Sequence, residues 1–438
     1  MKVASAVLIL AAAAPLLPLV HAAGNSQNCI IGGINPNLDY YPDKATPFNI
    51  SQTSLRLDYY NTYKTITNKV DGQVVVMYPC GSTAPNVTGA SVTIPVPIRS
   101  VDIEDTSVIT FLEAIGVRST IKFSSVTSTT TSPCLQQMLA SGTLQSTSAA
   151  NSSLKISQLQ ALDAVFSTSQ VTNTGWAANT VLFSAASDVG ALQRIEWINV
   201  VGMLYNLEFV AQAAGKSIIS NYQRMSANAR TYASGSKTSL TIAFVTTYKG
   251  QYTVSGAQQF KDYASDLGLK YLAPAVYSSP SSFSAAAASV DILIDLSSYG
   301  IGGATATSFN NFYGLQGSTL KFITNNRVYS PDKTGPYGGG SDWFESAVLE
   351  QNVVLADLIA ICYPAIAPTG YSPRYFRNVL SGESQVVTQA SSCTNVNATL
   401  TVPNILPAIV TSLSQQSSPG LLLVILSVVV CIMTHRLA

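Results

Sequence analysis

Apolar residues in the middle of the chain recur at the spacing of an α-helix. Between Gly190 and Tyr232 most of them fall three or four positions apart, and no proline interrupts the run. This periodicity predicts a helix with one apolar face, roughly 60 Å long if it is unbroken. Such a helix is longer than a small domain is wide, so it either breaks at Gly215 or spans two lobes. The flanking segments favour the spanning helix, because each side reads as its own α/β unit.

The sequence before this helix predicts a strand-rich part followed by a first α/β lobe. We expect residues 23–95 to be largely extended and residues 96–189 to form the lobe. The elements predicted here are strands at 63–67 and 73–78 around the turn Asp71-Gly72, a strand at 99–103, a helix at 106–115 that Gly116 ends, and a strand at 121–123.

A second α/β lobe is predicted over residues 233–395. Its expected elements are strands at 240–245, 291–295 and 320–323, a helix at 255–267, and one long helix at 342–363. The predicted fold class is therefore α/β, with two lobes whose central β-sheets are flanked by helices and which one long inter-lobe α-helix joins. Two lobes joined in this way leave a cleft that suits a ligand.

Both ends of the chain carry targeting patterns. Residues 1–22 predict a secretory signal peptide, because a lysine precedes an apolar run that ends in Val20-His21-Ala22. A Ser/Thr-rich stalk is expected at 396–420, and an anchor signal at 421–438. The final apolar run is short for a membrane span, so we favour a glycosylphosphatidylinositol anchor over a retained single span. The expected location is the extracellular face of the plasma membrane, and Ser412, Ser414 and Ser417 stay open as the attachment residue.

Glycosylation and disulfides are expected in this compartment. Asparagines in Asn-x-Ser/Thr sequons are Asn49, Asn86, Asn151 and Asn397. Cys431 lies in the tail, which leaves five cysteines, so we expect two disulfides and one free thiol. Cys362–Cys393 is the preferred pair because both lie in the last third of the chain. Cys29–Cys80 and Cys80–Cys134 both stay open as the second pair.

Histidine and charge exclude several classes of function. The only histidines are His21 and His435, and both lie in segments that we expect to be removed. A mature chain without histidine cannot use Ser-His-Asp or Cys-His catalysis, nor bind zinc or haem iron through histidine. A net charge of +1, with 10% charged residues and no basic patch, argues against a nucleic-acid partner. Carboxylate chemistry stays open.

Several segments resemble helical-backbone periplasmic solute-binding proteins and their secreted fungal and algal relatives. The similarity covers about residues 75–365. The motifs that carry it are Arg99–Gly116, Glu196-Trp197-Ile198 with Gly202, Tyr205, Asn206 and Glu208, Asn326-Arg327 with Tyr329, Asp332-Lys333, Gly339-Gly340 with Asp342-Trp343-Phe344-Glu345, and Leu355 with Asp357-Leu358.

The resemblance implies capture of a tetrapyrrole-like or metal-chelate nutrient in an inter-lobe cleft. Algal cobalamin acquisition proteins look closest in layout, so cobalamin is favoured and a ferric siderophore comes next. No cofactor is implied, and a membrane transporter or receptor would be the downstream partner. Members that bind zinc or manganese use histidine ligands, which this chain lacks.

Candidate ligand contacts lie in loops after the strands. They are Glu104, Asp105, Thr106, Trp176, Tyr248, Lys249, Tyr252, Tyr299, Tyr337 and Trp343. Each has a structural alternative: Asp105 and its neighbours also suit a helix N-terminus, and Trp343 also suits packing between a helix and a sheet.

Three functions are compatible with these patterns. We favour a cell-surface solute-binding protein that is not an enzyme. One alternative is a structural or adhesive glycoprotein that keeps the fold without a ligand. The other is a glycan hydrolase that uses carboxylates such as Glu104 or Asp105.

Overall fold

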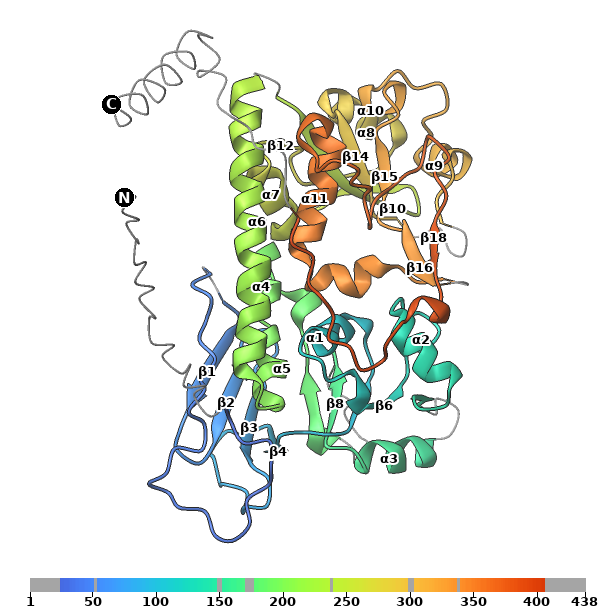
Figure 1. The fold of residues 1–438 in the computed structure, drawn as a ribbon. Helices are drawn as coiled ribbons and strands as arrows, with labels where there is room; N and C mark the ends of the chain where they lie inside the picture. Colours follow the sequence, from blue (N-terminus) through green and yellow to red (C-terminus); the bar gives the residue numbers. More distant parts are fainter. Residues whose placement is uncertain are drawn as a thin grey trace, which may run out of the picture.

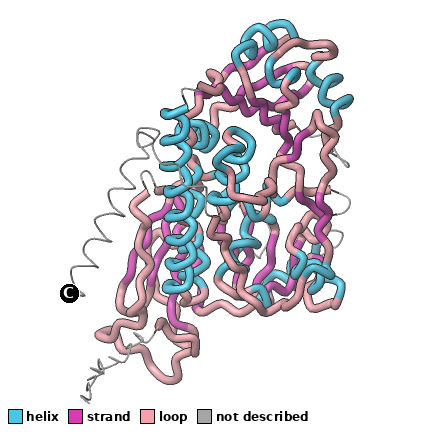
Figure 2. Tube along the Cα trace, turned by 45° about the horizontal axis from the view of Figure 1, so that its top comes forward, coloured by secondary structure: helices cyan, strands magenta, loops and turns pink. Residues whose placement is uncertain are grey.

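Two α/β lobes lie along one long helix, with a small sheet beside the lower lobe (Figure 1). The computed structural model describes residues 24–50, 53–147, 152–169, 177–236, 239–297, 303–336 and 339–405. The long helix, α6 (Glu208–Ser236), runs alongside both lobes from either viewing direction (Figure 2). The predicted fold class is therefore confirmed.

The N-terminal sheet has the order β1-β2-β3-β4, and the hairpin predicted around Asp71-Gly72 is present in it. Its buried face belongs to the same hydrophobic core as the first lobe. The strands are β1 (Leu55–Tyr59), β2 (Lys64–Asn68), β3 (Val74–Pro79) and β4 (Val92–Val96).

Lobe 1 contains a parallel sheet of order β7-β6-β5-β8-β9. Its strands are β5 (Val101–Ile103), β6 (Ile121–Ser124), β7 (Gln145–Ser146), β8 (Ala164–Ser167) and β9 (Thr180–Leu182). Its helical elements are η1 (Thr106–Val108), α1 (Ile109–Ala114), η2 (Arg118–Thr120), α2 (Pro133–Ala140), α3 (Ser152–Gln160), η3 (Ala177–Asn179) and η4 (Ala185–Ser187).

Lobe 2 contains a sheet of order β13-β11-β10-β14-β15-β17, with β12 also paired to β10. The strands are β10 (Thr241–Tyr248), β11 (Gln251–Val254), β12 (Lys270–Tyr271), β13 (Ala275–Tyr277), β14 (Ile292–Asp295), β15 (Val328–Ser330) and β17 (Arg377–Asn378). The helical elements are α7 (Gln258–Asp266), α8 (Pro280–Ala286), η5 (Ala287–Ser289), α9 (Ala306–Tyr313), α10 (Lys321–Thr324), α11 (Gln351–Cys362) and η8 (Pro364–Ile366).

Two elements of lobe 2 were predicted wrongly. The strand expected at 320–323 is the helix α10, a single turn whose phenylalanine, Phe322, is fully buried. The single helix expected at 342–363 is broken into η6 (Asp342–Phe344), η7 (Ser346–Val348) and α11. It breaks at Glu345 (φ −110°, ψ −83°) and again at Glu350 (φ −81°, ψ +54°), because the backbone leaves helical geometry at both residues.

The inter-lobe region is a helical hairpin rather than one helix from 190 to 232. Short helices α4 (Ala191–Ile195) and α5 (Ile198–Leu204) precede a turn at Asn206, where φ is +55°, and α6 then packs back against α5. Gly202 permits this contact, because a Cβ there would lie 2.6 Å from the Cβ of Ala211. Even so α6 joins the lobes, since Ile218 belongs to the core of lobe 1 and Met225 to that of lobe 2.

Gly215 does not break α6; it accommodates a neighbouring side chain. A Cβ at Gly215 would lie 2.4 Å from the ring of Phe48. We therefore expect Gly215→Ala to destabilise the protein by about 1–2 kcal/mol, because the overpacking cost exceeds the gain in helix propensity. Urea denaturation measures this change. Adding Phe48→Ala should remove the clash, so equal losses with and without Phe48 would contradict the explanation.

The C-terminal strap, residues 386–405, crosses from lobe 2 to lobe 1 and returns to α6 (Figure 1). Strand β18 (Val386–Thr388) pairs with β16 (Thr334–Pro336), and η9 (Ala390–Ser392) then packs on α2. Polar side chains hold the rest of the strap by hydrogen bonds to its backbone carbonyls. Arg118 donates to Val396 (2.6 Å) and Ala398 (3.1 Å). Further along, Asn352 donates to Pro403 (2.6 Å) and Asn221 donates to Ile405 (2.7 Å).

The preferred disulfide, Cys362–Cys393, is wrong. Cys393 pairs with Cys134, which places a covalent bond between the strap and α2, and the open alternative Cys29–Cys80 forms. Cys362 is a buried free thiol on α11 inside the core of lobe 2. Closeness in sequence misled the prediction, because the strap carries Cys393 away from α11 to the other lobe.

The predicted signal peptide and anchor signal lie outside the described residues. Among the residues that are described, no helix is both long enough and apolar enough to cross a membrane.

Candidate functional site

Strand β5 of lobe 1 and strand β15 of lobe 2 end at the same region, between the lobes. We call residues 341–350 the crossing segment, because they run between the two sheets (Figure 1). Thr106, just after β5, donates through its hydroxyl to the carbonyl of Phe344 (3.2 Å). On the other side, Ser341 donates to the carbonyl of Pro331, just after β15 (2.5 Å). In α/β sheets ligands bind outside the carboxyl ends of the strands, so this region is the candidate site.

An exposed aromatic ring lies in the crossing segment. Phe344 is 64% exposed, although the residues that follow it are buried. An exposed phenylalanine beside the strand ends can stack on a flat ligand. In the sequence, Phe344 stands out only as part of a motif, and the neighbouring Trp343 is the predicted ligand contact.

The lobe 1 candidates are placed at this edge but already have partners. Glu104 pairs with Lys155 at 3.1 Å, and Asp105 accepts from the backbone N–H of Ser107 at 2.9 Å. Asp105 therefore has the N-cap role considered as its alternative. Thr106 touches the crossing segment, so it stays the best placed of the three for a ligand contact.

The lobe 2 candidates separate into exposed and buried groups. Tyr248 ends β10 with 71% of its surface exposed, and Lys249 forms the hairpin turn with φ +48°. Tyr252 points into the core, where its ring stacks on Phe283 (5.2 Å between centroids), so the structure leaves it no open face for a ligand. Trp343 packs against Phe376 (5.3 Å) and is partly buried, in line with its structural alternative.

Other predicted positions cannot be placed. The ligand candidates Trp176, Tyr299 and Tyr337 and the sequon residue Asn151 lie outside the described residues. The sequons at Asn49, Asn86 and Asn397 each begin with an exposed asparagine, and their glycosylation stays a prediction.

Asp102 is a buried carboxyl group that the sequence analysis did not single out. It lies on β5 with no exposed surface, and its Oδ1 accepts from the hydroxyl of Thr147. Its Oδ2 has no hydrogen-bond partner among the described residues. Burial, with a smaller contribution from Glu104, raises the pKa of Asp102 to about 7. The sequence alone does not show that Asp102 is buried. A single acidic residue among apolar ones also occurs at the exposed end of a strand, and the two cases have the same pattern.

Carboxylates from the crossing segment join the two lobes. Glu345 accepts from the backbone N–H groups of Thr131 and Ser132, both at 2.7 Å, at the start of α2. Asp342 accepts from the hydroxyl of Thr131 at 2.7 Å and from Arg374 at 2.7 Å. The lobes are therefore held together by buried polar contacts as well as by the strap.

This cluster predicts how stability depends on pH. Burial, and then repulsion from Asp342, raises the pKa of Glu345 to about 8, from an ordinary value of 4.5. Because the folded state holds this proton more tightly than the unfolded state, the free energy of unfolding should fall as the pH rises from about 5 to 8. Asp102 acts in the same direction. Thermal unfolding at pH 5, 6.5 and 8 measures the slope, which Glu345→Gln should flatten; a stability that rises over this range would contradict the account.

Metal ligands are not clustered. Across the described ranges, no group of three or more His, Cys, Asp or Glu side chains is arranged to hold a metal ion.

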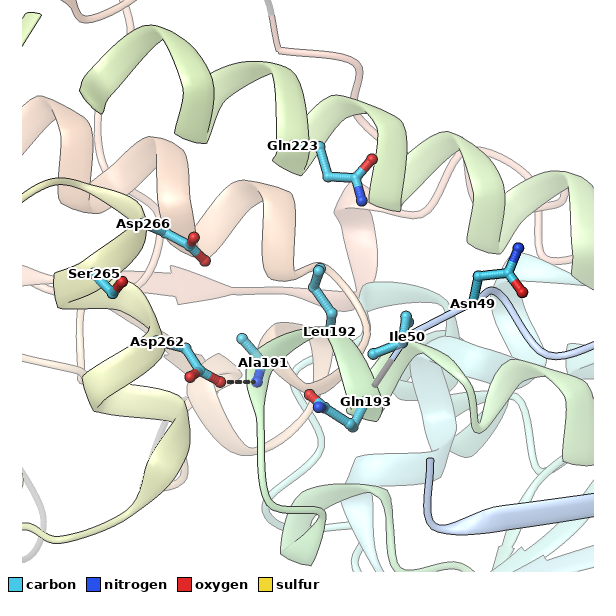
Figure 3. Close-up of a pocket in the computed structure, with 9 residues that line it drawn as sticks. All are labelled: Asn49, Ile50, Ala191, Leu192, Gln193, Gln223, Asp262, Ser265 and Asp266. Carbon is cyan, nitrogen blue, oxygen red and sulfur yellow. Dashed lines mark hydrogen bonds between the residues drawn. The ribbon is translucent and has the colours of Figure 1, made fainter. Parts of the chain in front are cut away.

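A polar groove lies beside α6, on the side of the helix where α4 and α7 meet it (Figure 3). It has a volume of about 300 Å³, and Gln223 reaches into it from α6. A second groove of about 310 Å³ shares Asn49 and Gln223 with it. Neither contains a residue that the sequence analysis proposed as a ligand contact. The residues lining the first are Asn49, Ile50, Ala191, Leu192, Gln193, Gln223, Asp262, Ser265 and Asp266.

No protein-family model and no curated protein matches the chain. Solved structures of bacterial binding proteins are similar to it. A periplasmic binding protein from Veillonella parvula is 13% identical, covering 61% of this chain and 85% of its own, with a TM-score of 0.43. A periplasmic heme binding protein from Pseudomonas aeruginosa is 13% identical, covering 66% and 99%, with a TM-score of 0.44. An ABC-type Fe3+-hydroxamate transport system from Saccharomonospora viridis is 12% identical, covering 64% and 98%, with a TM-score of 0.45. Similarity of this size assigns neither a family nor a function.

Proposed function

We propose that this protein is an extracellular solute-binding protein that holds a small ligand between its lobes. The observation that carries the proposal is that a strand end from each lobe, of β5 and of β15, meets the crossing segment, where Phe344 is exposed. Two facing sheet edges offer loops from both lobes to one ligand. The ligand would be captured for uptake, and no catalytic step is part of the proposal.

The ligand that we favour is a tetrapyrrole-like molecule or metal chelate, with cobalamin first and a ferric siderophore second. Phe344 and Tyr248 offer large aromatic surfaces at the strand ends, which suit a flat, partly apolar ligand. A chelate brings its metal already coordinated, so the protein needs no metal ligands of its own. The location that we propose is the outer face of the plasma membrane, held by a C-terminal lipid anchor.

Binding should occur without large movement of the lobes. The strap, the Cys134–Cys393 disulfide and the contacts of Glu345 all join lobe 1 to lobe 2. Hinge closure would have to break several of these at once, so we infer a largely preformed site.

Calorimetric titration of the secreted protein tests the proposal. Cobalamin, a ferric hydroxamate and haem are titrated separately. We expect at least one to bind with a Kd below roughly 100 μM, about −5.5 kcal/mol. Weaker binding of all three would count against solute capture.

A structural or adhesive surface protein is the second candidate. The observation that favours it is the same set of links between the lobes, because a protein that never opens could have kept the fold and lost the ligand. The titration separates the two candidates. The hydrolase alternative is less favoured, because Glu104 and Asp105 already pair with Lys155 and the Ser107 amide.

A further inference from the structure

Asn49 projects between two residues that are fixed on the molecule. Phe48 seats its ring against Gly215 of α6, and its backbone N–H donates to Glu196 at 2.7 Å. Ile50, on the other side, packs against the core of lobe 1. Asn49 between them has φ +58° and is exposed. The side chain is therefore held outward at a fixed place beside α6.

The two grooves beside α6 meet at this asparagine. Both are lined by Asn49 and Gln223, and their other polar residues come from α4, α6 and α7, with Thr46 from the N-terminal segment. Amide and carboxylate side chains offer the paired donors and acceptors that neighbouring sugar hydroxyls need. Groups of this kind in the grooves are Gln193, Gln223, Asp262 and Asp266, and the ring of Phe48 adds an apolar surface.

We propose that Asn49 carries an N-linked glycan whose first sugars lie in these grooves along α6. In the modification, Nδ2 of Asn49 bonds to the anomeric carbon of an N-acetylglucosamine carried on a lipid pyrophosphate. The bond from sugar to phosphate breaks, and the amide proton leaves with the lipid pyrophosphate. The seated sugars bridge the N-terminal segment, α6 and α7, and so cover the junction of the two lobes. This inference rests on the extracellular location in the proposed function.

Asn86 supplies a matched control within the same chain. It is also exposed and heads a sequon, and it lines neither of these two grooves. The full chain is expressed in a secreting eukaryotic host, and glycopeptide mass spectrometry measures occupancy at both sites. A peptide-N-glycosidase then removes glycans from the native protein. We expect the glycan on Asn49 to be released at least tenfold more slowly than that on Asn86, with equal rates after denaturation.

Two variants distinguish a glycan whose first sugars lie in the grooves from one that is only linked to Asn49. Gln223→Ala, an exposed change on α6, should speed release from Asn49 and leave release from Asn86 unchanged. Ser51→Ala, which abolishes the sequon, should lower the melting temperature by about 2 °C or more, against no measurable change for Asn86→Gln. The proposal would be overturned if Asn86 carried a glycan and Asn49 did not. It would also be overturned if the two glycans were released from the native protein at equal rates. Neither result would alter ligand binding between the lobes, so a failure here is distinct from a failure of solute capture.

Discussion

Lys64→Met is expected to destabilise the protein by about 3–5 kcal/mol, because it leaves a buried carboxylate without its partner. The Nζ of Lys64 lies 2.5 Å from Oε1 of Glu208 and 2.7 Å from Oδ1 of Asn206, and it also lies over the ring of Tyr41. Neither charged side chain is more than 1% exposed. This pair fixes the N-terminal sheet to the start of α6, and urea denaturation measures its loss.

Lys44→Met is the matched control for this change. Lys44 pairs with Asp39 at 2.8 Å, but both side chains are well exposed, so the same substitution should cost at most about 1 kcal/mol. Adding Glu208→Leu to Lys64→Met should recover part of the loss, since it removes the unpaired charge. Similar losses from Lys64→Met and Lys44→Met would contradict a role for burial.

Removing the disulfide Cys134–Cys393 should destabilise the protein and loosen the lobes. The bond closes a sequence separation of 259 residues, so replacing both cysteines by serine should cost about 3–5 kcal/mol. The distribution of distances between spin labels placed on the two lobes should also broaden. Both effects follow because the strap would keep only non-covalent contacts with lobe 1, such as the packing of η9 on α2 and the hydrogen bonds from Arg118.

The disulfide Cys29–Cys80 provides the comparison. It closes a separation of 51 residues and links no part of lobe 1 to lobe 2. Replacing this pair by serine should lower stability somewhat less and leave the distances between the lobes unchanged. If both double variants broadened the distances equally, the strap would not be what holds the lobes together.

Local patterns predicted much of the fold. The hairpin at Asp71-Gly72 and the strands β10 and β14 follow from short apolar runs bounded by turn residues, which depend on neighbours in sequence. The turn at Asn206 could not be predicted in this way, because the apolar spacing continues through it. The reversal depends on distant contacts, since the Asn206 side chain bonds to Lys64 and to the carbonyl of Ser26.

The candidate site was harder to predict, because its geometry depends on contacts between distant residues. Glu345 reads as one more polar position in a helical run, and its bonds to Thr131 and Ser132 span more than 200 residues. In the sequence, Tyr252 follows a strand and is predicted to lie in a loop. In the structure it lies on β11, after the hairpin turn at Lys249, and its side chain is in the core. Cys393 likewise finds its partner only through the path of the strap.

A single titration series tests the central claim, that a ligand binds between the lobes against Phe344. Cobalamin, or whichever of the three ligands binds, is titrated calorimetrically into the wild type, Phe344→Ala and Phe209→Ala. Phe209 is an exposed phenylalanine at the start of α6, away from the crossing segment. We predict that Phe344→Ala weakens binding at least tenfold, about 1.4 kcal/mol, and that Phe209→Ala leaves it unchanged. Equal affinities for all three proteins would contradict the account.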